Sequence, residues 1–148
     1  RKDAIRDLKY ELSVYSDINY PVMEENQIAK AVVDAAFRIH KELGPGLFES
    51  VYESVLDYEL ANEYGLLVQR QPVLPVVWKE IKLDLGFKPD LIVANKVIVE
   101  LKSVEKVLPV HYKQLLTYLK LTGLKLGLLI NFNEALIKNG IKRVANGL

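Results

Sequence analysis

The fold is decided by the stretch GFKPDLIVANKVIVELK, residues 86–102. Two runs rich in Val, Ile and Leu flank residues 94–96, a short loop that is typical of a β-hairpin. A three-residue loop places Asp90 directly across from Glu100, and because strand side chains alternate, Lys102 shares their face. Two carboxylates and an ammonium group are costly to place at the end of an apolar hairpin. The hairpin therefore predicts a functional site.

The rest of the chain alternates between helical and strand patterns. Apolar periodicity predicts helices over residues 26–43, 48–64 and 109–122, each followed by a glycine that ends it. Strands are predicted over residues 67–78, 81–83 and 126–131, and the two prolines in the first favour an edge or bulged strand. Residues 137–144 fit either a helix or a strand. This order predicts an α/β (α+β) fold with a mixed central β-sheet flanked by helices.

The length of the chain predicts one folded domain. With 148 residues, we assign residues 26–148 to the domain and residues 1–25 to an N-terminal arm that could contain a short helix over residues 4–12. No cysteine is present, which excludes disulfides and thiolate metal sites, and two histidines argue against an imidazole zinc site. No apolar stretch is long enough for a membrane helix and no signal peptide is evident, so we expect a cytoplasmic protein without a membrane partner.

Charge is distributed unevenly along the chain. Residues 1–87 carry 10 basic and 15 acidic side chains, and residues 88–148 carry 10 basic and 4 acidic ones. A basic half is the pattern expected for a protein that binds a polyanion such as nucleic acid. A solvated surface that keeps the protein soluble explains the charge equally well. Lys88 and Lys106, which flank the hairpin, could contact phosphates or remain solvated.

Three motifs identify a family resemblance. Pro89-Asp90, followed after nine residues by Glu100-Leu101-Lys102, resembles the signature of the PD-(D/E)XK nuclease superfamily. The sequence GLFESVY at residues 46–52 is similar to the motif that names the GxxExxY family of that superfamily. In the helix predicted over residues 109–122, QLLTY at residues 114–118 resembles the QxxxY motif of RecB-type nucleases. The resemblance covers residues 26–148 and implies a restriction-endonuclease-like core.

The resemblance also implies roles for single residues. Asp90 and Glu100 would be metal ligands together with the backbone carbonyl of Leu101, and Glu49 would be a further acidic ligand. Lys102 would orient or deprotonate the attacking water and stabilise charge on the phosphate. The cleft would be lined by side chains of the helix over residues 109–122, namely Gln114 and Tyr118, which lie four residues apart on one helix face.

The chemistry of these residues supports a cation site independently. Oxygen ligands without sulfur or imidazole suit a hard cation such as Mg²⁺ or Mn²⁺. Two carboxylates about 4 Å apart repel by roughly 4 kcal/mol at an effective dielectric constant near 20. Bringing Glu49, Asp90 and Glu100 together is therefore unfavourable without a cation, since Lys102 offsets only part of the repulsion. A bound divalent ion removes it and provides a nucleophile near neutral pH for phosphodiester hydrolysis.

Several of these residues have a second interpretation. Glu100 and Lys102 could form an ordinary ion pair at a strand end. Glu53, one helical turn after Glu49, is a rival for the role of ligand, although such acidic stripes are usually solvated. Tyr52 is better explained by packing than by chemistry. His111 precedes Gln114 by three residues and could line the same cleft, but lone histidines are often structural.

Two functions remain open at this stage. The first is a metal-dependent nuclease acting on DNA or RNA, with Mg²⁺ or Mn²⁺ as cofactor. The second is a catalytically silent module that binds nucleic acid or a protein and keeps the nuclease fold. The intact set of Asp90, Glu100, Lys102 and Glu49 favours the first, because loss of activity would be expected to erode it. A homodimer would let two clefts act on two strands, but no feature of the sequence specifies one.

Overall fold

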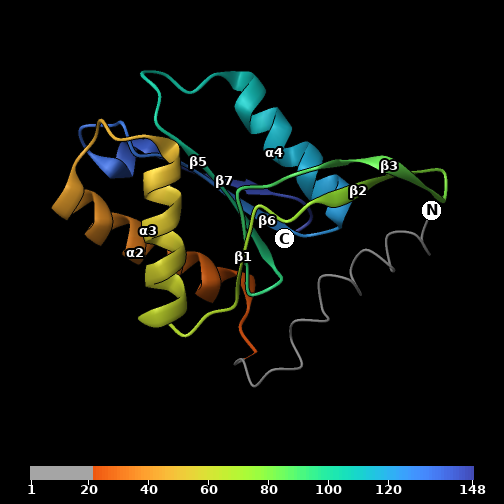
Figure 1. Ribbon diagram of the computed structural model, residues 1–148, viewed down its shortest axis with the longest axis horizontal. Helices are drawn as coiled ribbons and strands as arrows, with labels where there is room; N and C mark the ends of the chain where they lie inside the picture. The colour runs from red at the N-terminus through yellow and green to blue at the C-terminus, as the bar shows by residue number, and fades with distance from the viewer. Residues whose placement is uncertain (1–21) are drawn as a thin grey trace.

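The computed structural model of the protein describes residues 22–148 (Figure 1). A five-stranded sheet at its centre has the order β1-β4-β5-β6-β7. Its strands are β1 (Val68–Arg70), β4 (Leu91–Val93), β5 (Val97–Lys102), β6 (Leu126–Asn131) and β7 (Ile141–Ala145). β5 and β6 run parallel and every other neighbouring pair runs antiparallel, so the sheet is mixed, as predicted.

Helices cover both faces of the sheet (Figure 1). α2 (Glu25–Leu43) and α3 (Glu49–Asn62) pack on one face, where Val97, Val99 and Leu101 of β5 join their core cluster. α4 (Pro109–Thr122) packs on the other face against Ile98 and Leu129. All six residues of β6 are buried, as expected for a strand that is covered on both faces. The predicted helices and the predicted central strand are therefore confirmed.

Close packing of α4 requires a glycine in β6. A Cβ atom at Gly127 would lie 2.8 Å from Cδ1 of Leu115, closer than side-chain carbons approach one another. Because glycine has no side chain, α4 packs directly on β6, the strand that follows it in the chain. α4 thereby connects the parallel pair β5 and β6, in the usual β-α-β arrangement.

The hairpin of residues 86–102 forms with the predicted register. Leu91 pairs with Val99, Ile92 with Ile98 and Val93 with Val97. Ala94 and Asn95 in the loop both have positive φ, +51° and +57°, which closes the turn. The strand alternation places Glu100 on the same side of β5 as Ile98, the side that faces α4. The local prediction is confirmed at every paired position.

The prediction of one strand over residues 67–78 is wrong. Strand β1 ends at Arg70, and β1 and β2 (Leu74–Trp78) belong to different sheets. β2 pairs with β3 (Ile81–Phe87), which is longer than the predicted strand 81–83, in a separate two-stranded sheet with a register irregularity. This ribbon projects away from the main sheet (Figure 1). The break occurs at Gln71-Pro72, because proline cannot donate to a strand ladder.

The C-terminal segment contains both of the structures that its sequence allowed. A short 3₁₀-helix, η2 (Ile137–Gly140), leads directly into the edge strand β7. The helix considered for residues 4–12 lies outside the described residues. None of the helices within residues 22–148 combines the length and the apolar character that crossing a bilayer requires.

Candidate active site

Asp90 and Glu100 lie side by side at one end of the main sheet. Asp90 directly precedes β4, and its backbone N–H donates to Oε1 of Glu100 at 3.2 Å. Beyond the last paired position of the hairpin, the N–H of Leu101 donates to Oδ2 of Asp90 at 2.8 Å. The Asp90 side chain therefore takes the place of a missing strand partner for β5, and this bond fixes its direction.

Burial makes this pair of carboxyl groups electrostatically unusual. Glu100 is only 5% exposed, and its burial, followed by the nearby charge of Asp90, raises its pKa to about 8. Burial also raises the pKa of Asp90, although the hydrogen bond from Leu101 opposes that shift. Both shifts favour a proton on this pair over two negative charges. A cation that displaces this proton would allow both groups to ionise.

Lys102 is the positive charge nearest to this pair on the same strand. Its charge lowers the pKa of both Asp90 and Glu100. The backbone at Lys102 is fixed because its carbonyl accepts the N–H of Phe132 at 2.9 Å. Buried Asn131 holds the loop that follows, donating to the carbonyl of Val104 and accepting its N–H. The lysine is thus placed by the ends of the two parallel strands.

The two glutamates of α3 lie in different surroundings. Glu49 is exposed at the first helical turn, and its Oε1 accepts the N–H of Ser103, the residue after Lys102, at 3.2 Å. Glu53 is 3% exposed and accepts hydrogen bonds from Arg70 at 2.8 Å and from Gln71 at 3.0 Å. The charge of Glu53 contributes to raising the pKa of Asp90. Glu49 therefore lies at the end of β5, and Glu53 lies on the Asp90 side of the site.

A hard cation such as Mg²⁺ needs several oxygen ligands that converge on one point. Within residues 22–148, no group of three or more His, Cys, Asp or Glu side chains lies close enough together to hold a metal ion. Asp90 and Glu100 do converge, and Glu49 does not join them in such a group. Two adjoining carboxylates that are largely withdrawn from water offer the kind of oxygen ligand that Mg²⁺ and Mn²⁺ prefer. The chemistry of this pair fits such an ion.

α4 contributes Tyr118 to the site. Its ring packs on Phe87 with a centroid separation of 5.0 Å. Burial raises the pKa of the Tyr118 hydroxyl, and the charges of Glu100 and Asp90 add to the effect, so this hydroxyl lies near the carboxyl pair. Gln114 lies one turn earlier and is exposed.

His111 is engaged at the first turn of the same helix. Its Nδ1 accepts the backbone N–H of Leu108 at 3.0 Å. The first N–H groups of a helix lack partners within the helix, so this bond satisfies one that would otherwise be open. His111 therefore has a structural role at the start of α4.

Tyr52, the last residue of the GLFESVY segment, has a packing role. It is fully buried and stacks on Phe132 with 4.4 Å between ring centroids. Its hydroxyl donates to the carbonyl of Gly44 at 2.6 Å and accepts the N–H of Leu47 at 3.1 Å. These bonds fix the loop between α2 and α3, and so set where Glu49 enters the site.

Sequence reasoning missed two residues of this region, Arg70 and Gln71. They follow one another at the end of β1 and both donate to the carboxylate of Glu53. The only local signal was Pro72, because proline cannot donate to a strand ladder and a strand is expected to stop there. Their pairing with Glu53 depends on how α3 packs beside β1, which no local pattern reports.

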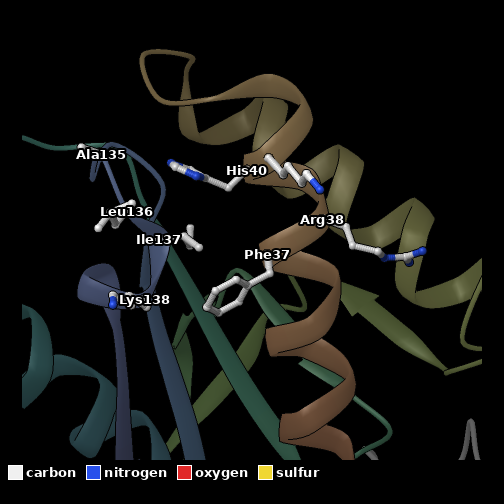
Figure 2. Close-up of a pocket in the computed structure, with 8 residues that line it drawn as sticks. Phe37, Arg38, His40, Ala135, Leu136, Ile137 and Lys138 are labelled. Atoms are coloured by element: carbon white, nitrogen blue, oxygen red, sulfur yellow. The ribbon is translucent and has the colours of Figure 1, made fainter.

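A cavity of about 460 Å³ lies away from these residues, between α2 and η2 (Figure 2). Its walls include Phe37 and His40 from α2, with Leu136 and Ile137 from the opposite side. His40 is held there by a 2.7 Å hydrogen bond between its Nε2 and the carbonyl of Glu134. None of the carboxylates discussed above lines this cavity.

Comparison with known proteins bears on the fold and the family. A family model described as the PD-(D/E)XK nuclease superfamily matches residues 26–144. A solved structure titled "Crystal structure of SSO0001" is similar with a TM-score of 0.51 and 15% sequence identity, over 99% of this chain and 78% of that chain. At that identity the likeness shows the fold alone; together with the family model and the mixed sheet it confirms the predicted restriction-endonuclease-like core. No curated protein matches the chain.

Proposed function

Because the chain belongs to the PD-(D/E)XK nuclease superfamily, we propose that it is a nuclease that hydrolyses phosphodiester bonds of DNA or RNA with Mg²⁺ or Mn²⁺. Within the superfamily we place it in the GxxExxY family, on the segment at residues 46–52. The observation that carries the proposal is the convergence of half-buried Asp90 and buried Glu100, whose pKa values are raised by burial and lowered by the charge of Lys102. A structural ion pair joins one acid to one base and has no need for a second acid beside the first.

Each residue has a role that follows from its position. Asp90, Glu100 and the carbonyl of Leu101 would hold the cation. When bound, such a cation lowers the pKa of a coordinated water and offsets charge on the phosphate. Lys102 would orient the attacking water and stabilise the charge that develops on the phosphate oxygens. The hydroxyl of Tyr118 would line the cleft from the α4 side.

Glu49 is our candidate for the additional acidic ligand. Its carboxylate is exposed and, within residues 22–148, accepts one backbone N–H at 3.2 Å, so little would have to break for it to bind a cation. Glu53 is buried and already accepts bonds from Arg70 and Gln71. Glu49→Gln should therefore reduce cation-dependent cleavage more than Glu53→Gln does, and the reverse order would transfer the ligand role to Glu53.

The proposal is tested by incubating the purified protein with single- and double-stranded DNA and RNA, in Mg²⁺, in Mn²⁺ and with chelator. We expect cleavage of at least one substrate that requires the cation and stops with chelator. Binding of nucleic acid without cleavage under every condition would instead identify a catalytically silent binding module. Cleavage that persists in chelator would contradict a cation-dependent site.

A further inference from the structure

Gln71 has a backbone conformation that its sequence position disfavours. Its φ is +48°, a left-handed value that is uncommon for residues other than glycine. It also precedes Pro72, and the residue before a proline is normally restricted to extended backbone with negative φ. Strained backbone of this kind persists where surrounding contacts hold it, and it is concentrated at functional sites. Since Gln71 is exposed, packing of its own side chain does not explain the strain.

The contacts of Gln71 join two elements that both reach the site. Its backbone N–H donates to the carbonyl of Asp90 at 2.8 Å. Its side-chain amide donates to both carboxylate oxygens of Glu53 on α3, at 3.0 and 3.3 Å. One residue thus connects the loop that carries Asp90 to the helix that packs beside it.

The Glu53 side chain is held in place by its burial and its hydrogen bonds. It is 3% exposed, and Arg70, whose side chain is 40% exposed, binds it at 2.8 Å. Hydrogen bonds to a charged group are stronger than those between neutral groups. A buried carboxylate that has both a guanidinium and an amide donor is satisfied where it lies, and it would lose these bonds by moving toward a cation.

We propose that Gln71 is a positioning residue: anchored on Glu53, it holds the backbone of Asp90 so that the Asp90 carboxylate stays directed at β5. The direction of that carboxylate is reported by one bond, from the N–H of Leu101 to Oδ2 of Asp90. The consequence for cation binding rests on the function proposed above. The predicted effect on the Leu101 hydrogen bond is independent of that function, because it concerns the cation-free protein.

Hydrogen exchange of the Leu101 amide in the full-length, cation-free protein tests this. Gln71→Gly and Gln71→Asn both tolerate positive φ, so the turn is preserved, but neither side chain reaches Glu53 as the glutamine does. We expect the Leu101 amide to exchange about tenfold faster in both variants, the size of one lost hydrogen bond. The amide of Leu129 in β6 should be unchanged, which would exclude global destabilisation.

Gln69→Ala is the matched control, because Gln69 has the same side chain two residues earlier, in β1, and makes no hydrogen bond with Glu53 within the described residues. It should leave the Leu101 amide at the wild-type rate. Titration with Mn²⁺ alone adds a second measurement, and both Gln71 variants should bind it about tenfold more weakly than wild type. Glu53→Gln, which keeps an acceptor oxygen, should protect Leu101 better than Glu53→Ala.

The outcomes separate the two proposals. Unchanged Leu101 exchange in Gln71→Gly and Gln71→Asn would overturn the positioning role, even if the wild type cleaves nucleic acid. A wild type that neither binds Mn²⁺ nor cleaves would overturn the nuclease proposal, while faster Leu101 exchange would still support the role of Gln71.

Discussion

Two antiparallel ribbons of similar composition differ sharply in burial in this protein. β4 and β5 are buried at every position except the half-buried Lys102, whereas six of the seven residues of β3 are exposed. Both ribbons are rich in Val, Ile and Leu and both carry an aspartate and lysines. The difference lies in their neighbours. β1 and β6 flank the first ribbon and helices cover its faces, while β2 and β3 form a sheet of two strands.

This difference explains why chemistry is expected in one ribbon alone. A carboxylate on a covered ribbon loses its water, which disfavours the charged form and makes a cation or a proton a strongly favourable partner. Glu100 shows the effect through its raised pKa. Asp84 on β3 lies exposed to solvent, where a cation would have to compete with water for the same carboxylate.

The largest contrast is expected in activity. If the proposed site is correct, Asp90→Asn or Lys102→Ala should lower cation-dependent cleavage by about a thousandfold or more, since each removes a charge from that site. The same changes in the exposed ribbon, Asp84→Asn and Lys79→Ala, should leave cleavage at the wild-type rate. Initial rates on the preferred substrate measure this, with circular dichroism to confirm folding. Cleavage that survives both of the first two changes would place the active site elsewhere.

The second contrast concerns stability. Ile98→Ala, at a fully buried position of β5, should lower the free energy of unfolding by about 2–5 kcal/mol, because it leaves a cavity in the core. Ile81→Ala on β3, where the side chain is 59% exposed, should change it by about 0.5 kcal/mol. Urea denaturation of both variants provides the comparison. Equal losses would mean that a partner or another part of the chain covers the β2–β3 ribbon in solution.

The third contrast depends on pH. The pKa of Glu100 rises from 4.5 to about 8 on folding, so between these values the folded protein binds more protons than the unfolded chain. The cation-free protein should therefore become less stable as pH rises through this window, by at most about 1.4 kcal/mol per pH unit from this group. Glu100→Gln should flatten that slope, and Asp84→Asn should leave it intact. Urea denaturation at a series of pH values measures the slopes, and a slope that is retained in Glu100→Gln would contradict the assignment.

The smallest contrast is expected in binding. Lys88 lies between β3 and β4, where the two ribbons join, and is a candidate phosphate contact. Lys88→Gln should weaken nucleic-acid binding by a few-fold and reduce the slope of log affinity against log salt concentration by about one. Lys79→Gln, at the far end of the exposed ribbon, should have little effect. Fluorescence anisotropy at several salt concentrations measures both, and binding that is insensitive to salt would argue against phosphate contacts altogether.

Much of the fold follows from local patterns. The loop at residues 94–96 and the apolar runs around it specify the register of β4 and β5, and the structure has that register. The helix over residues 109–122 begins at a proline and ends at Gly123, whose φ is +73°, as local rules for helix ends require. The break at Gln71 was not predicted: Pro72 marks a place where a strand can end, but no local pattern shows that β1 and β2 join different sheets.

One part of the candidate site also follows from local patterns, and another part does not. Alternation along β5 places Glu100 and Lys102 on one face, and the hairpin turn sets Asp90 opposite Glu100, so sequence alone predicts this juxtaposition. The surroundings of Glu49 and Glu53 could not be predicted from it. Both lie on one helix stripe, and only the packing of α3 beside β1 pairs Glu53 with Arg70 and leaves Glu49 at the end of β5.

By itself, the sequence determined the three helices, the central strand, how the central hairpin pairs and which side chains share its face. These are consequences of backbone sterics and of a strand period of two, which act over a few residues. The tertiary structure decided which hairpin is buried, which glutamate of α3 is already paired, and where the strained Gln71 connects. Burial and buried charge pairing depend on what packs against a segment, and those partners come from distant parts of the chain.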